Sequence, residues 1–422
     1  MAARNYLLTP LATRPSGAGR RHLLRGVAWL GAALATLAVA QPATTPAATP
    51  TAPATTPAAT RPGPAPAARP EASILAQPPA KDPTAPAAAG SDSAAATTQP
   101  GNALRVVLLL PTEQALLRRA AGSVRDGAMA VFGGRKQDVV VIDCAYPVDG
   151  VVATYSRCVD DSVDWVIGPL SRADVTALAA AKLPVVRPTL MLSPLGASPP
   201  TPLAVLAPDL ESEAEAITQQ AGEDACRKPL VVEAAGPIAN RVAVAMYAAW
   251  RERNAIAIQQ TRLGSRESWR RAADGWRQEH VDCVLFAGGG AVLTELRPYL
   301  RNIAVYATSA AYETSLERTV DWTGVRIADA PWLIDAERAE FAGFAPAPTQ
   351  TGTPDAAAVS PTLARLYALG VDAARLTLVA GREALPTAFD GAIGRLTLRD
   401  SQYRRTPMVG EFRERNLVRI GP

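Results

Sequence analysis

Short apolar runs alternate with longer segments of helical periodicity from residue 104 to about residue 307. Several runs, such as Leu104–Leu110 and Pro229–Glu233, are nearly continuous Val, Ile and Leu, which is typical of strands buried on both faces. The predicted strands are Leu104–Leu110, Asp138–Asp143, Asp164–Ile167, Pro184–Val186, Pro229–Glu233, Ala255–Gln260, Val281–Phe286 and Ile303–Ala307. The predicted helices are Glu113–Phe132, Val151–Val159, Arg172–Ala181, Leu210–Cys226, Ile238–Arg253, Arg266–Glu279 and Ala291–Leu300. This alternation predicts βαβ units and parallel sheets.

The pattern changes in the last third of the chain. A strand is predicted at Gly324–Ile327, and Ser360-Pro361 begins a helix with one apolar face. Short alternating strands follow at Gly394–Leu398, Met408–Phe412 and Leu417–Ile420. The whole indicates an α/β protein with two doubly wound lobes, hinged around a central cleft. We expect a first lobe of about 104–207 plus part of 328–385. The second lobe is expected at about 208–327 plus the C-terminal strands.

Residues 1–103 do not have the composition of a folded domain. Three arginines precede the uncharged apolar stretch Gly26–Ala40, which predicts an export signal over residues 1–40, cleaved before Gln41. About 15 apolar residues are fewer than a typical membrane span needs, but an uncleaved membrane anchor is the alternative. Residues 41–100 contain 20 Ala and 14 Pro, so residues 41–103 are predicted to be a disordered Ala/Pro/Thr-rich linker.

Charge and histidine content exclude several kinds of site. The chain has 43 Lys and Arg, 39 Asp and Glu, 2 His and a net charge of +4. Eight of the bases but only three of the acids precede residue 104, so residues 104–422 carry 35 bases and 36 acids. This body lacks the basic excess that binding to nucleic-acid phosphates requires. His280 is its single histidine, which excludes His-based triads and multi-histidine metal sites.

Candidate ligand-binding residues follow the predicted strands, because ligands of open α/β sheets bind at strand carboxyl ends beside helix N-termini. Hydroxyls and free N–H groups there would suit a carboxylate or another small polar ligand, although Thr112 and Ser171 equally suit helix capping without a ligand. The candidates are Pro111, Thr112, Glu113, Gly168, Pro169, Leu170, Ser171, Thr308, Ser309, Asp329 and Trp332.

Other motifs do not indicate catalysis. Gly288-Gly289-Gly290 follows a predicted strand but lacks the spacing and the Gly-Lys-Ser/Thr ending of phosphate loops, so a tight turn explains it better. Asp160, Asp161 and Asp164 lie at a helix end and a strand start, which favours a solvated edge. No nucleophile has a base beside it in the pattern. We therefore expect no catalytic residue, no metal and no cofactor.

Four cysteines stand in a chain predicted to be exported, where disulfides persist. They allow three pairings. Cys144 ends a predicted strand and Cys158 lies on the helix that follows, so we expect a local Cys144–Cys158 bridge. Cys226 and Cys283 are then either a second bridge or two buried thiols.

Three segments together resemble one known family. Thr323–Ile334 (TGVRIADAPWLI), Arg365–Leu376 (RLYALGVDAARL) and Phe389–Leu398 (FDGAIGRLTL) are similar to the C-terminal domain of LpoA-like penicillin-binding protein activators, the LppC family. Val166–Leu170 (VIGPL) and Ala307-Thr308-Ser309 also resemble it, over about residues 104–422 in all. The resemblance implies a type I periplasmic-binding-protein fold and a non-enzymatic regulator of peptidoglycan synthesis. Its expected partner is a bifunctional, class A penicillin-binding protein, activated by direct binding.

The resemblance also implies a periplasmic, envelope-associated protein. Members of the family are outer-membrane lipoproteins, but no cysteine stands at or near Gln41, so we expect membrane association only through the leader or another anchor. The alternative function is a solute-binding protein of an ABC transporter for amino acids or similar small polar ligands. A predicted cleft and the VIGPL loop favour that alternative, and a muropeptide is a second ligand to consider for the cleft.

Overall fold

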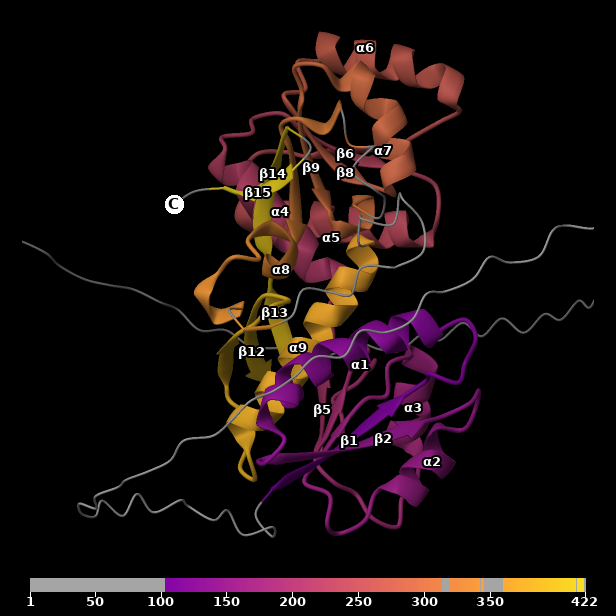
Figure 1. Cartoon of the computed structure of the whole chain (residues 1–422). Coiled ribbons are helices and arrows are strands. Elements are labelled where there is room, and N and C mark those ends of the chain that lie inside the picture. Colours follow the sequence, from indigo (N-terminus) through magenta and orange to yellow (C-terminus); the bar gives the residue numbers. More distant parts are fainter. Residues whose placement is uncertain are drawn as a thin grey trace, which may run out of the picture. The chain divides into compact units, whose positions relative to one another are not determined.

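The computed structural model describes residues 103–312, 319, 321–341, 343–344, 360–414 and 416–420, which belong to one compact unit of the chain (Figure 1). The predicted export signal, and the predicted linker except for Ala103, lie outside these residues. Two separate sheets, of eight and seven strands, organise the described part. This confirms the α/β class with two doubly wound lobes.

The first lobe is built on the sheet β11-β12-β13-β5-β4-β3-β1-β2. Its parallel strands are β1 (Leu104–Leu110), β2 (Val139–Ala145), β3 (Trp165–Ile167), β4 (Thr189–Met191) and β5 (Leu203–Leu206). The helices of this lobe are α1 (Arg118–Phe132), α2 (Val151–Cys158), α3 (Arg172–Ala180) and α9 (Pro361–Ala380). Two antiparallel hairpins complete the sheet with β11 (Ala388–Asp390), β12 (Arg395–Arg399) and β13 (Gln402–Thr406), the last parallel to β5.

The second lobe is built on the sheet β15-β14-β10-β9-β8-β6-β7. Its parallel strands are β6 (Pro229–Glu233), β7 (Gln259–Arg262), β8 (Cys283–Ala287), β9 (Ala304–Thr308) and β10 (Val325–Asp329). The antiparallel strands β14 (Met408–Arg413) and β15 (Asn416–Arg419) extend it. The helices are α4 (Leu210–Glu223), α5 (Pro237–Arg253), α6 (Trp269–Gln278), α7 (Gly290–Leu296) and α8 (Pro331–Ile334). Short 3₁₀ turns are η1 (Gly133–Arg135), η2 (Arg266–Ser268), η3 (Arg297–Leu300), η4 (Ser309–Ala311) and η6 (Ala339–Phe341).

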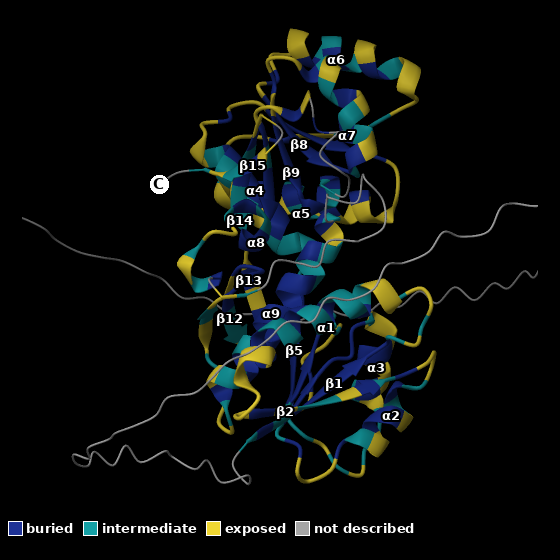
Figure 2. Cartoon of the chain, viewed as in Figure 1, coloured by how far each residue is buried: buried dark blue, intermediate teal, exposed yellow. Residues whose placement is uncertain are grey.

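Both sheets are buried between helices, as continuous Val, Ile and Leu strands require. The central strands of each lobe are dark blue in Figure 2, and so is most of α9. In the first lobe α1 packs closely on α9 because two glycines face the partner backbone. A Cβ at Gly127 would lie 2.0 Å from the carbonyl oxygen of Tyr367, and one at Gly370 would lie 2.0 Å from that of Val124. The glycine within YALGVD is therefore required by helix packing.

Several parts of the sequence prediction differ from the structure. Strands β5, β11 and β13 were not predicted, and β7 begins at Gln259 rather than at Ala255. Pro184–Val186 is not a strand: the strand begins at Thr189, after Pro188, since proline cannot donate to a ladder. The helix predicted from Glu113 begins at Arg118, because residues 112–117 form turns. The C-terminal strands, expected with the second lobe, are divided: β12 extends the first sheet, while β14 and β15 extend the second. Within the described residues, no helix is long and apolar enough to span a bilayer.

Candidate functional site

The first-lobe candidates lie at the carboxyl ends of β1 and β3, but most of them are occupied by contacts within the protein. Pro111, Gly168, Pro169 and Leu170 are buried, Thr112 is half-buried and Glu113 is exposed. Gly168 has φ +115°, and a Cβ there would lie 2.0 Å from the Leu109 carbonyl oxygen, so only glycine fits. This turn brings the VIGPL loop against β1 and leaves little of it for a ligand.

Ser171 caps helix α3 and belongs to a buried hydrogen-bonded cluster. Its Oγ accepts a bond from the backbone N–H of Asp174 (3.1 Å) and donates to the Asp174 carboxylate (2.5 Å). The Tyr146 hydroxyl donates to the same carboxylate at 3.1 Å. Burial, followed by the nearby Asp174 charge, raises the pKa of Tyr146 well above its usual range. The polar groups of Ser171 are thus satisfied by its own lobe.

The second-lobe candidates are also buried. Thr308, Ser309 and Asp329 lie at the carboxyl ends of β9 and β10 with at most 6% of their surface exposed. Trp332 packs against Phe341 and Tyr367, with ring centroids 5.5 Å away in each case. Trp332 is therefore part of the hydrophobic core around α9, the helix by which the chain returns to the first lobe.

Two buried ion pairs connect the lobes beside these residues. Arg405 of β13 binds Glu213 of α4, with N–O 2.5 Å and side chains 1% and 2% exposed. Arg365 of α9 binds Asp329 of β10 through two bonds of 2.6 and 2.7 Å. Glu213 also accepts the backbone N–H of Ser309 at 2.8 Å. We call Glu213, Arg405, Asp329 and Arg365 the interlobe quartet; it is electrically neutral when all four groups are charged.

The electrostatics of the quartet follow from burial. Loss of solvent raises the pKa of Glu213, which the Arg405 charge opposes and the Asp329 charge reinforces. Burial lowers the pKa of Arg365, but the charge and hydrogen bonds of Asp329 more than compensate and hold that pKa above its usual value. The four groups therefore depend on one another for their charges. Of the four residues, only Asp329 was predicted from the sequence, because the other three lie within helices and strands rather than at strand ends.

A further buried acid, Asp372 of α9, fixes the loop before β12. Its carboxylate accepts the backbone N–H groups of Ala392 (2.7 Å) and Ile393 (2.8 Å), and Arg375 lies 3.4 Å away. Burial raises the pKa of Asp372 to about 6, although these bonds act in the opposite direction. Asp372 lies within the segment RLYALGVDAARL, where its role is positioning of the backbone.

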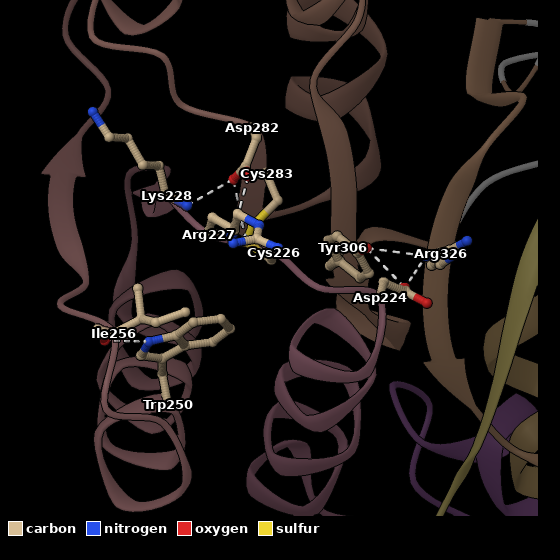
Figure 3. The surroundings of a disulfide bond; sticks show 10 residues. All are labelled: Asp224, Cys226, Arg227, Lys228, Trp250, Ile256, Asp282, Cys283, Tyr306 and Arg326. Carbon is tan, nitrogen blue, oxygen red and sulfur yellow. Dashed lines mark hydrogen bonds and ion pairs between the residues drawn. A yellow bond between two sulfur atoms is a disulfide. The ribbon is translucent and has the colours of Figure 1, made fainter.

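The structure joins Cys144 to Cys158, the pair chosen from the sequence, and Cys226 to Cys283. Figure 3 shows the second bridge, where Asp282 accepts the backbone N–H groups of Arg227 (2.9 Å) and Lys228 (2.8 Å). Cys226, Asp282 and Cys283 are close enough to one another to hold a metal ion, but their two sulfurs are bonded together. The arrangement is therefore that of a structural disulfide.

Two hollows elsewhere on the body do not coincide with the candidate cleft residues. One of about 600 Å³ lies at the amino ends of β6–β8, lined by residues such as Lys228, Ile256 and His280. Another of about 210 Å³ lies between the lobes, where α4 faces β5 and β13. Neither is lined by any of the eleven candidates. Cavity size alone thus gives no support to a ligand at the strand carboxyl ends.

No protein-family model matches the chain, and no curated protein sequence matches it. Solved structures do. A protein assigned to branched-chain amino acid ABC transport, from Chromobacterium violaceum, is 26% identical with TM-score 0.62, over 73% of this chain and 100% of that one. Full-length LpoA from Haemophilus influenzae is 20% identical with TM-score 0.58, over 76% of this chain and 60% of LpoA. The LpoA C-domain, described as a regulator of PBP1A, is 19% identical with TM-score 0.57, over 75% and 100%.

The two-sheet α/β architecture of this chain superposes on these structures over about three quarters of its length. At such identities the likeness to LpoA is one of fold. The described body of this chain therefore has the type I periplasmic-binding-protein fold, which it shares with the C-terminal domain of LpoA and with binding proteins of ABC transporters.

Proposed function

We propose that the protein is a non-enzymatic periplasmic regulator that activates a class A penicillin-binding protein by direct binding. The interlobe quartet is the observation that carries this proposal. A solute-binding protein closes its lobes around a ligand and opens again, so contacts between its lobes must break at small cost. Separating Arg405 from Glu213, or Arg365 from Asp329, breaks hydrogen bonds between charged groups, which are worth about 1.5–3 kcal/mol each.

The interlobe quartet also hydrogen-bonds the polar groups that would otherwise be available to a ligand. Ser309 donates its N–H to Glu213, and Asp329 is already paired with Arg365. A body with fixed lobes presents one constant surface, which suits a protein partner better than a solute. The resemblance in sequence to LpoA-like activators and the shared fold with the LpoA C-domain support the same choice.

Reconstitution tests the proposal. The full chain should bind a purified class A penicillin-binding protein in a surface-based assay and increase its rate of peptide cross-linking. The Chromobacterium violaceum protein of the same fold is the control, because it separates an effect of the fold from an effect of this sequence. Absence of both binding and stimulation would remove the regulatory function.

A second candidate is solute binding for an ABC transporter. The Chromobacterium violaceum protein, at 26% identity and covered over its whole length, is a specific observation in its favour. A thermal-shift screen against amino acids and muropeptides discriminates the two candidates. Ligand at 100 times its dissociation constant adds about 2.7 kcal/mol to the free energy of unfolding, a shift of several degrees. A clear shift with an amino acid, together with no effect on cross-linking, would favour transport.

A further inference from the structure

The hairpin formed by β12 and β13 has one buried face and one exposed, basic face. Burial alternates along both strands, so the inward side chains, Leu396, Leu398, Tyr403 and Arg405, contribute to the interior. The outward face consists of polar and basic residues, namely Arg395, Thr397, Arg399, Gln402, Arg404 and Thr406. The period of a strand thus gathers three arginines on one solvent-facing surface.

Arg399 and Arg404 are neighbours on this face. The register pairs Arg399 with Gln402 and Thr397 with Arg404, so the two arginines are diagonal across the hairpin. Long side chains reach each other at a diagonal position. Within the described residues, neither guanidinium has a hydrogen bond or ion pair, whereas Arg395 on the same face lies 3.9 Å from Asp390. Two adjacent positive charges therefore lack a protein anion.

The two arginines line a hollow of about 430 Å³. Its other lining residues are Ser198, Asp400 and Gln402. The Gln402 amide donates to the Ala197 carbonyl (3.2 Å) and so fixes the loop before β5 against the hairpin tip. β13 runs parallel to β5, so this tip lies at the amino end of the first sheet. The candidate cleft residues of this lobe lie at the opposite, carboxyl end.

We propose that this hollow binds a ligand carrying an oxyanion, a carboxylate or a phosphate. Paired guanidinium groups match the geometry of both anions, and the Ser198 hydroxyl and Gln402 amide supply neutral donors beside them. Asp400 is the single acid of the lining and opposes an anion. The site is separate from the interlobe quartet, so the inference does not depend on the proposed function.

Calorimetric titration of the full chain at low ionic strength tests the site with inorganic phosphate and with succinate, and co-sedimentation tests it with insoluble peptidoglycan. We expect the double change Arg399→Gln with Arg404→Gln to weaken binding about tenfold or more, since bonds to charged groups are the strong ones. Arg395→Gln, on the same face, is the matched control and should alter binding less than twofold. Binding of the two small probes identifies the oxyanion, and co-sedimentation lost in the double variant identifies a polymer carboxylate.

The variant Asp400→Asn is expected to bind the anion more tightly, a result that damage to the fold would not produce. Asp400 and Ser401 have φ +50° and +59°, as in a two-residue hairpin turn that accepts Asn equally well. Removing this acid should strengthen binding of the anion several-fold. The proposal is overturned if none of the three probes binds, if the double variant binds as the unchanged chain does, or if Asp400→Asn weakens binding.

Discussion

Two consecutive arginines on β13 have opposite surroundings. Arg405 points into the protein, is 4% exposed and binds Glu213 across the lobes. Arg404 points outward into the hollow of the hairpin and, within the described residues, has no acid partner. The strand period alone separates them, because successive side chains lie on opposite faces. The face of the strand, rather than the residue type, therefore decides whether a charged side chain stabilises the fold or is free to bind a ligand.

The largest expected effect is the loss of Arg405. Arg405→Met keeps much of the side-chain volume but leaves Glu213 buried without its cation. Breaking such a pair by removal of one partner costs about 3–5 kcal/mol, which we expect as the decrease in the free energy of unfolding in urea. The matched control, Arg404→Met, makes the same chemical change one residue away and should stay within about 0.5 kcal/mol. Equal effects of the two variants would contradict the opposite roles.

The buried carboxyl of Asp372 gives the next effect, which depends on pH. Its pKa is raised from 3.8 to about 6 in the folded protein, so folding favours its protonated form. The contribution of protonated Asp372 to the free energy of unfolding is therefore fully present below about pH 4 and is lost as pH rises through 6. The difference of roughly two units corresponds to about 3 kcal/mol. Glu213, whose pKa is also raised, acts in the same direction.

Urea unfolding between pH 4 and pH 7 measures this dependence. Asp372→Asn removes the titrating group. Between pH 4 and pH 7 the free energy of unfolding of this variant should therefore decrease less than that of the unchanged chain. Burial raises the pKa of Glu233, but hydrogen bonds such as that from Arg262 outweigh burial and lower the pKa overall. Glu233 therefore contributes in the opposite direction, equally in both proteins. Parallel pH profiles for the two proteins would show that Asp372 does not titrate in this range.

A smaller effect is expected at the edge of the first lobe, where Ser171 is both a ligand candidate and a helix cap. Ser171→Ala removes the acceptor of the Asp174 N–H and should cost about 1 kcal/mol of unfolding free energy. Ser171→Asn, which also caps helices well, should restore most of that loss. Loss of stability in both variants would argue that the bond from the hydroxyl to the Asp174 carboxylate matters more than the cap.

Much of the fold was predictable because the pattern of apolar runs is strong in both lobes. The apolar composition of strands such as Leu104–Leu110 and Pro229–Glu233 indicates that they are buried. Both strands are present in the structure with those bounds. β13 was missed because Gln402–Thr406 contains a buried arginine where an apolar residue is expected. Its charge is compensated by Glu213, which is 192 residues away in the chain.

The candidate site was less predictable, because its polar groups also pair with residues that are distant in the chain. Strand ends identify where a ligand binds in this class of fold, and the structure does place Ser309 and Asp329 at such ends. Their groups are satisfied by Glu213 and Arg365, which lie on helices and carry no local signal of that contact. A pairing between distant elements is a property of the assembled lobes, so one sequence alone does not reveal it.

The smallest expected effect on protein stability comes from the two outward arginines, Arg399 of β12 and Arg404 of β13. Arg399→Gln with Arg404→Gln removes two neighbouring positive charges that lack an anion, so the free energy of unfolding should change by less than about 0.5 kcal/mol. Any gain should appear at low ionic strength and vanish at high salt, because exposed charges are screened. Urea unfolding at two salt concentrations measures it. A large loss at both concentrations would mean that the two arginines serve the fold as Arg405 does, and the hollow would then have no free charge for a ligand.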